Sequence, residues 1–415
     1  MTVANLNPGH GIDTDLVARA IALQPLLAAN AEATENNREA HPDNIAALED
    51  AGLFEVIVPK RVGGLGATLS TQLAVAAELG AACPSTAWVQ TLLNVATWAT
   101  SRSAGKCQDE VWGGGQRGRV FGVLAPSGTA APVDGGYMVS GSWGFASGGF
   151  HGNWAGGGVF VLDADGNIVA PGMATMPIAE VSIKDTWHVA GMQGTASNTV
   201  VAENVFVPAH RVGIGLDLND TNGAPAEATD RWPVGAVLAL ILTGPLLGAA
   251  RAVADTVASK APSRGISYTT YFTTDSSQVA VTELARGRLD IETAWLHAFN
   301  AAAYIDAVGA GAEPDIAENA RLRGSCGYLT DHLRLGVERL LNVAGAGAFA
   351  KSNPIQRLWR DVNVGSRHAF LATNPSLETY GRSLLGQDPI YLVTSERLVN
   401  DSTIEVCIVC GNVDS

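Results

Sequence analysis

Positively charged residues are scarce in this sequence. Lys and Arg total 26 against 40 Asp and Glu, so the formal net charge is −14, and only 16% of the residues are charged. Nucleic acids and anionic membranes are bound through concentrated cations that neutralise phosphate groups, and the chain has no such segment. We therefore expect neither nucleic acid nor a membrane as a partner.

Cysteine is scarce as well, with only five residues, at positions 83, 107, 326, 407 and 410. An odd number of mostly distant cysteines suits a reducing compartment, and the N-terminus lacks the basic and apolar regions of a secretion signal. We therefore expect a cytoplasmic protein. Cys407 and Cys410 have CxxC spacing but lie in an apolar run without a second pair or a nearby histidine, which favours strand packing over zinc binding. No metal site is predicted.

Long apolar runs are missing too, although 47% of the 415 residues are hydrophobic. The stretch closest to a membrane span, Trp232–Ala250, contains Gly and Pro residues that favour a buried helix. A chain of this length and composition can bury the cores of two or three sub-domains.

The periodicity of apolar residues divides the chain into three segments. Residues 1–118 have helical spacing, residues 119–215 have short β-rich runs separated by Gly, Asn and Asp, and residues 230–415 return to helical spacing. Hairpin turns are predicted at Asp134-Gly-Gly and Asp165-Gly-Asn. The last segment should form a four-helix bundle, with helices at about 233–260, 276–307, 315–343 and 354–385. The fold class is α+β, mostly α, with a β-barrel or sandwich in the middle.

Six short motifs follow one another in this framework. They are Pro59-x-x-x-Gly63-Gly64-Leu65-Gly66, Cys83-Pro-Ser-Thr-Ala-Trp88, Gly141–Gly148, Gly191–Ser197, Val205–Arg211 and Arg357-x-x-Arg360-Asp361. In this order they resemble the acyl-CoA dehydrogenase fold, over about residues 15–390. Within that fold the chain looks most like two-component (group D) flavin-dependent monooxygenases.

The resemblance implies an oxidoreductase that takes reduced FMN or FAD from a separate, transiently bound flavin reductase. It implies reaction with O₂ through a flavin hydroperoxide, hydroxylation of a small, aromatic or polycyclic substrate, and a homotetramer built as a dimer of dimers. No strand–GxGxxG–helix fingerprint for a nicotinamide cofactor occurs, which agrees with a separate reductase.

The resemblance also assigns residues to the flavin. Phe145, Ser147 and Gly148 would lie against the ring, and Tyr137–Ser147 is read as a strand pair that presents them. The remaining cofactor-binding candidates are Thr195 and Ser197 in a second loop, Arg264 and Gln278 reaching across from a neighbouring subunit, and Arg360 with Asp361.

His368 is the main catalytic candidate, together with Ser147 and Asn94. In the dehydrogenases of this fold, a catalytic glutamate follows the Arg-Asp pair by about two helical turns. Here no Asp or Glu occurs between Asp361 and Glu378. A histidine can control a proton near reduced flavin or take one from a phenol, because it titrates near neutral pH. If one helix spans both residues, Asp361 and His368 share a face about 10 Å apart along its axis. Asn94 is a main polar group of an otherwise apolar helix that would line the substrate cavity.

Other functions on the same fold remain open at this point. They are an acyl-CoA dehydrogenase or oxidase with its base elsewhere, an oxygenase acting on nitrogen or sulfur, a flavin-independent oxygenase, and a flavin-free binding or scaffold protein.

Overall fold

The computed structural model describes residues 11–103, 105–214, 223–387 and 390, and these residues form two compact units. A helical unit contains the chain up to Trp98, the segment Trp187–Ala196 and the chain from Ala226 to Ile390. A β unit contains Ala99–Thr186 and Ser197–Pro225. Cys407 and Cys410 lie outside the described residues.

The β unit is built on one seven-stranded sheet with strand order β5-β6-β2-β1-β3-β4-β7. Its strands are β1 (Val120–Val133), β2 (Gly136–Ala146), β3 (Trp154–Leu162), β4 (Ile168–Pro177), β5 (Ser182–Lys184), β6 (Asn198–Pro208) and β7 (Val212–Ile214). The short helix α7 (Gly105–Trp112) belongs to the same unit. The sheet's hydrogen-bonded order ends at β5 and β7.

Both predicted hairpins are confirmed, because β1 pairs antiparallel with β2 and β3 pairs antiparallel with β4. Gly135 adopts a φ of +76°, which a glycine reaches without strain, and this allows the tight turn between β1 and β2. The prediction of a strand pair within Tyr137–Ser147 was wrong. That stretch is almost entirely one strand, β2, which pairs with β1 on one side and β6 on the other.

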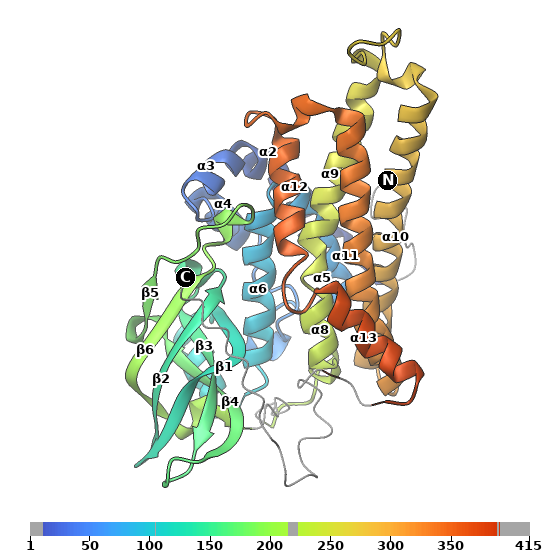
Figure 1. The fold of residues 1–415 in the computed structure, drawn as a ribbon. Helices are drawn as coiled ribbons and strands as arrows, with labels where there is room; N and C mark the ends of the chain where they lie inside the picture. The colour runs from blue at the N-terminus through green and yellow to red at the C-terminus, as the bar shows by residue number, and fades with distance from the viewer. Residues whose placement is uncertain (1–10, 104, 215–222, 388–389, 391–415) are drawn as a thin grey trace. The chain divides into compact units, whose positions relative to one another are not determined.

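The helical unit joins helices from both ends of the chain. From the N-terminal part come α2 (Thr14–Ala29), α3 (Ala31–Asn36), α4 (Pro42–Asp50), α5 (Leu69–Ala82) and α6 (Pro84–Thr100). From the C-terminal part come α8 (Val234–Leu240), α9 (Thr243–Lys260), α10 (Gln278–Gly309), α11 (Ile316–Ala344), α12 (Pro354–Gly365) and α13 (Thr373–Leu384). Figure 1 shows α9, α10 and α11 running side by side in this unit, and their contacts agree.

Two of the four predicted bundle helices are each split in two. Pro245 is the third residue of α9, and Pro375 is the third residue of α13. A proline ring clashes with the carbonyl four residues earlier, here Ile241 and Leu371, if the helix continues through that position. Each helix therefore ends before the proline and a new one begins.

Among the described residues, one apolar segment, Val234–Ser263, could cross a membrane by length and composition, and its most apolar 18-residue window has a mean hydropathy of 1.8. In the structure 83% of that window is buried inside the protein. The segment contains α9, which packs closely on α5, since a Cβ on Gly248 would lie 1.9 Å from the carbonyl oxygen of Ala77. The segment is therefore packed as a core helix, as its Gly and Pro residues predict.

Candidate active site

His368 lies in a turn between α12 and α13, where the sequence predicts a continuous helix. Helix α12 is capped by Asn353, whose side chain accepts a hydrogen bond from the amide of Ile355, and it ends at Gly365. The prediction that Asp361 and His368 share one helix face was wrong, because α12 ends at Gly365, three residues before His368. His368 is instead part of a tight turn in which the amide of Leu371 donates to its carbonyl at 2.7 Å.

Aromatic rings surround His368. Its ring centroid is 5.8 Å from the ring of Trp88, in an edge-on arrangement, and 5.8 Å from the nearly parallel ring of Phe370. Trp88 is buried on α6, in the Cys83–Trp88 motif. An aromatic substrate could stack or pack edge-on in such surroundings.

The hydrogen bonds of the turn select the tautomer of His368. The backbone amide of Phe370 donates to its Nδ1 at 3.2 Å, so in the neutral ring the hydrogen lies on Nε2. Neutral His368 is therefore a hydrogen-bond donor at Nε2. Proton abstraction at that nitrogen would first require a change of tautomer.

The protonation state of His368 is set by its surroundings. Burial, assisted by the positive charge of Arg323, lowers the pKa of this histidine to about 4. The imidazole is therefore neutral at physiological pH.

We expect the His368 resonances to show no titration between pH 5.5 and 8, whereas an unperturbed histidine changes charge near pH 6.5. Because the folded pKa is lowered, this residue's contribution to stability is present above pH 6.5 and is lost as the pH falls toward 4. Two-dimensional NMR of histidine-labelled protein, assigned with His368→Asn, measures this directly. A midpoint near 6.5 would contradict the description.

Two arginines of α11 hold the turn that carries His368. Arg323 donates to the carbonyl of Ala369 at 3.1 Å, and its guanidinium lies 5.0 Å from the centre of the Phe370 ring. Arg334 donates to the side chains of Ser366 at 3.0 Å and Thr373 at 3.1 Å. Sequence reasoning missed both arginines. Their spacing of eleven residues, three helical turns, places them on one face of the helix. That spacing could have indicated from the sequence that both arginines contact the same segment.

In the β unit, Ser147 and Ser197 are brought together. Their hydroxyl oxygens are 2.5 Å apart, and both residues are buried. Ser147 follows the end of β2, and Ser197 directly precedes β6. One hydroxyl donates to the other, so the end of β2 carries a buried, hydrogen-bonded pair of hydroxyl groups.

Next to this pair the backbone adopts two left-handed conformations. Phe145 has a φ of +64° and Gly148 one of +76°, and the Phe145 side chain is 69% exposed. A bulky residue at positive φ is strained, and such strain clusters at functional sites. An exposed ring beside buried hydroxyls suits the face and the edge of a flavin ring.

Thr195 belongs to the helical unit, in the loop that precedes Ser197. It is buried, and its hydroxyl donates to the carbonyl of Met192 at 2.9 Å. Arg360 and Asp361 also contact this loop, through the carbonyl of Ala190 and the amide of Met192. Direct contact of these three residues with a cofactor stays a prediction.

Asn94 has a structural position that argues against its catalytic assignment. It is fully buried, and its side chain donates to the carbonyls of Leu53 and Gln90 and accepts from the amide of Ile57. These bonds anchor the chain that follows α4. The amide of Asn94 thus satisfies backbone groups, and its catalytic role stays a prediction.

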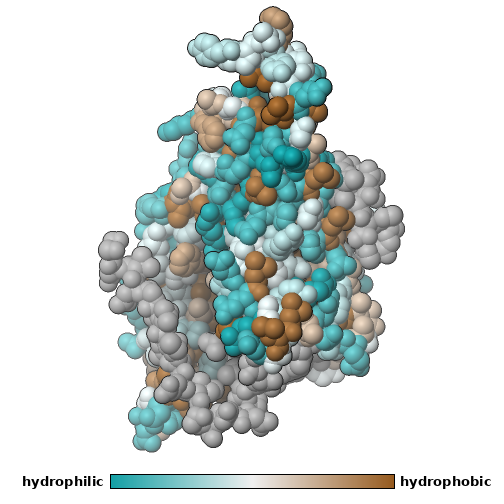
Figure 2. All heavy atoms as spheres, turned by 45° about the vertical axis from the view of Figure 1, so that its right-hand side comes forward, coloured by the Kyte–Doolittle hydropathy of each residue, from teal (hydrophilic) through white to brown (hydrophobic). Residues whose placement is uncertain are grey.

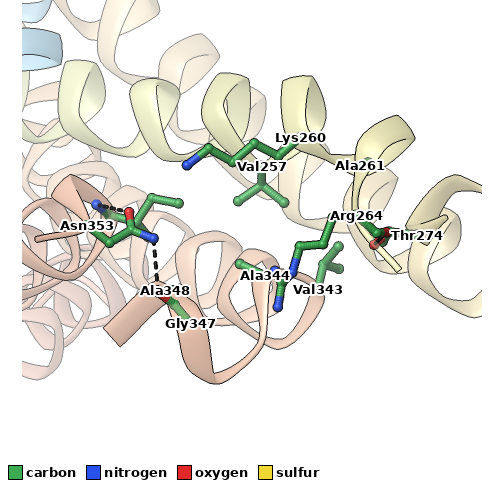
Figure 3. Close-up of a pocket in the computed structure, with 11 residues that line it drawn as sticks. Val257, Lys260, Ala261, Arg264, Thr274, Val343, Ala344, Gly347, Ala348 and Asn353 are labelled. Carbon is green, nitrogen blue, oxygen red and sulfur yellow. Dashed lines mark hydrogen bonds between the residues drawn. The ribbon is translucent and has the colours of Figure 1, made fainter. Parts of the chain in front are cut away.

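Arg264 lines a cavity of about 180 Å³ between the C-terminal end of α9 and the segment from Val343 to Ile355 (Figure 3). Lys260 lines the same cavity, and Asn353 and Thr274 add polar groups. Two cations around a small cavity suit a phosphate group. Gln278 is exposed at the first turn of α10 and lines a separate, open depression.

Comparison with known proteins places the chain in a family. The N-terminal domain model of acyl-CoA dehydrogenases matches residues 16–112, and the C-terminal domain model matches residues 240–373. The oxygenase subunit HsaA of a flavin-dependent monooxygenase from Mycobacterium tuberculosis (strain CDC 1551 / Oshkosh) is 31% identical over 378 residues, covering 88% of this chain and 94% of that protein. The chain belongs to this family of flavin-dependent monooxygenase oxygenase subunits, on the acyl-CoA dehydrogenase fold.

Two further relatives are similar over nearly their whole length. The oxygenase component of an FADH₂-dependent resorcinol hydroxylase from Rhizobium sp. (strain MTP-10005) is 31% identical, covering 90% of this oxygenase and 95% of that protein. The structure of XiaF from Streptomyces sp. in complex with FADH₂ and glycerol superimposes with a TM-score of 0.87 at 34% identity, covering 91% and 96% of the two chains. The predicted fold and enzyme class are thereby confirmed. Within the described part of the oxygenase, no group of His, Cys, Asp or Glu side chains could hold a metal ion.

Proposed function

We propose that this oxygenase uses O₂ and reduced FMN or FAD, supplied by a separate reductase, to hydroxylate a phenolic or polycyclic aromatic substrate. The observation that carries the proposal is a neutral histidine packed against Trp88 and Phe370. Relatives named for resorcinol and p-hydroxyphenylacetate hydroxylation support an aromatic substrate. The turn from Ser366 to Ala372 contains no carboxylate, which speaks against the acyl-CoA dehydrogenase alternative.

Each part of the chain has a distinct role in this proposal. Bound reduced flavin supplies the electrons that activate O₂. Ser147 and Ser197 would orient the ring by hydrogen bonding, and Phe145 would cover one of its faces. Arg264, with Lys260 beside it, would bind a phosphate of a neighbouring subunit's flavin. His368 would hold a hydrogen at Nε2 and donate it in a hydrogen bond to the developing negative charge, while Trp88 and Phe370 exclude water.

The test is incorporation of labelled oxygen. We expect the protein, supplied with a flavin reductase, flavin, NADH and ¹⁸O₂, to add one ¹⁸O atom to a phenol from a panel that ranges from resorcinol to polycyclic phenols. Mass spectrometry of the products measures this, and omission of flavin or of reductase provides the control. A product without ¹⁸O, or product formed without flavin, would refute the proposed function.

The proposal includes a cytoplasmic homotetramer, a dimer of dimers in which Arg264 and Gln278 reach the flavin of a neighbouring subunit. Large apolar side chains exposed on α10 and α11, including Leu289, Leu296 and Leu335, support an assembly through the bundle. Figure 2 shows apolar side chains scattered among polar ones on the face that it presents. Sedimentation velocity should give four copies of the 42.9 kDa chain, and a monomer at working concentrations would refute this part.

A further inference from the structure

The loop Trp187–Ala196 has a strained backbone. Met192 has a φ of +56° and Ala196 one of +46°, although neither is a glycine. Residues with side chains adopt such conformations rarely, and they persist only where surrounding contacts impose them. Side chains of α12 and α3 contact the loop that contains them.

Helix α12 binds the loop backbone through two adjacent side chains. The Asp361 carboxylate accepts a hydrogen bond from the amide of Met192 at 2.5 Å, and the Arg360 guanidinium donates to the carbonyl of Ala190 at 2.6 Å. Arg360 also pairs with Glu35 of α3, and Glu35 accepts from the side chain of Gln193 at 3.3 Å. The loop is thus tied at Ala190, Met192 and Gln193.

The same helix joins the loop to the surroundings of His368. A Cβ on Gly365, the last residue of α12, would lie 3.4 Å from the Trp88 ring and 3.6 Å from the Met192 side chain. Met192 and Trp88 therefore both lie close to the end of α12, three residues before His368. One helix fixes both the loop that carries Thr195 and the turn that carries His368.

We propose that Arg360 and Asp361 are positioning residues, which hold the loop Trp187–Ala196 in the conformation required for flavin binding and in register with His368. This inference rests on the proposed function, because it assigns the loop to the flavin. In this proposal Arg360 and Asp361 do not contact the cofactor directly. They act on flavin binding through the loop backbone that they hold.

The surroundings of Asp361 disfavour the charged form of its carboxyl group. Burial raises its pKa to about 7, and the Met192 amide, Arg360 and Arg357 offset only part of this effect, while Glu35 adds to it. A buried carboxylate costs more free energy than a buried neutral side chain and needs compensating contacts. The contact that matters for the loop is the hydrogen bond accepted from the Met192 amide, which an asparagine oxygen can accept in the same place.

The experiment compares Asp361→Ala with Asp361→Asn in the full-length protein. Hydrogen exchange of residues 190–196, measured by mass spectrometry without flavin, reports the loop, and anaerobic titration with reduced FMN and reduced FAD reports binding. In Asp361→Ala we expect at least tenfold faster exchange and at least tenfold weaker binding of the flavin that the wild-type protein prefers. Asp361→Asn should restore both to within about threefold of wild type. The control is Glu78→Gln, a buried carboxylate that pairs with Arg251 and makes no contact with the loop in the described structure.

The pattern of results separates this inference from the proposed function. Unchanged exchange in Asp361→Ala, or the same loss in Asp361→Asn and Glu78→Gln, overturns the positioning role. Faster exchange with unchanged flavin affinity overturns the link between loop and flavin, while wild-type activity still supports the proposed function. If the wild-type protein itself binds no reduced flavin, the proposed function fails, and the exchange data alone then decide whether α12 holds the loop.

Discussion

Replacing His368 by asparagine should lower the rate of substrate hydroxylation by roughly 10²–10⁴-fold, the usual contribution of a group that controls a proton in the transition state. The asparagine oxygen can still accept the hydrogen bond from the Phe370 amide, since it lies at the same distance along the side chain as Nδ1. The turn should therefore survive, and only the Nε2 hydrogen is lost. Consumption of O₂ should continue, with hydrogen peroxide as its product.

The measurements are hydroxylated product and hydrogen peroxide, each per O₂ consumed, together with reduced-flavin affinity. His297→Asn is a matched control, because His297 also has a pKa lowered by burial but packs against Tyr328 on the outer part of the bundle. We expect that control to leave the ratio of product to O₂ unchanged. Wild-type coupling in His368→Asn would show that the ring nitrogen has no part in the reaction.

His368→Gln completes this comparison by moving the polar group outward. A glutamine amide reaches approximately to the position of Nε2 and can donate there, although it no longer supports the Phe370 amide from the Nδ1 position. Partial recovery of coupling relative to asparagine would identify hydrogen-bond donation as the function of His368. No recovery with an intact fold would favour proton transfer through the ring.

Much of the architecture could be predicted because its causes are local. The spacing of Leu and Ala identifies the bundle helices, and Asp134-Gly-Gly and Asp165-Gly-Asn mark two hairpins. The breaks at Pro245 and Pro375 were missed although their cause is local as well. A proline in the first turn of a helix is a start signal, and it implies that the preceding helix has ended. Had this been applied, the long predicted helix would have been divided before α13.

The candidate site was harder to predict, because its partners are far apart in the sequence. From the sequence, Asn94 is a polar residue in an otherwise apolar helix. The structure shows that its side chain donates to the carbonyl of Leu53, 41 positions earlier in the chain. Arg360 and Asp361 form part of a motif, but their partners at Ala190 and Met192 lie about 170 positions earlier. Periodicity and composition contain no information on such pairs. Only the order of motifs brought Ser147 and Ser197 into one hypothesis.

Replacing Gly191 by alanine should have the second-largest effect on product formation. The substitution adds a methyl group to the loop without changing its charge or its hydrogen-bonding groups. A Cβ at this position would lie 2.5 Å from the carbonyl oxygen of Arg360 and 3.0 Å from the amide nitrogen of Asp361. Both neighbours are helix backbone and cannot rotate away, so the loop must move off α12. We expect a cost of about 1–3 kcal/mol, typical of overpacking. Because displacement of a binding group by about 1 Å can reduce activity roughly 10²-fold, we expect product formation to fall by a similar factor.

Gly381→Ala is the matched control for this substitution, because a Cβ there meets nothing within 4 Å. It lies within α13, so alanine should raise stability by about 0.5–1 kcal/mol and leave activity unchanged. Thermal unfolding, reduced-flavin titration and hydrogen exchange of residues 190–196 should be measured for both variants. Wild-type flavin affinity and exchange in Gly191→Ala would mean that the loop tolerates displacement from α12. The strained conformations of Met192 and Ala196 would then have no link to flavin binding, since the loop would bind flavin equally well without its contact with the Arg360 carbonyl.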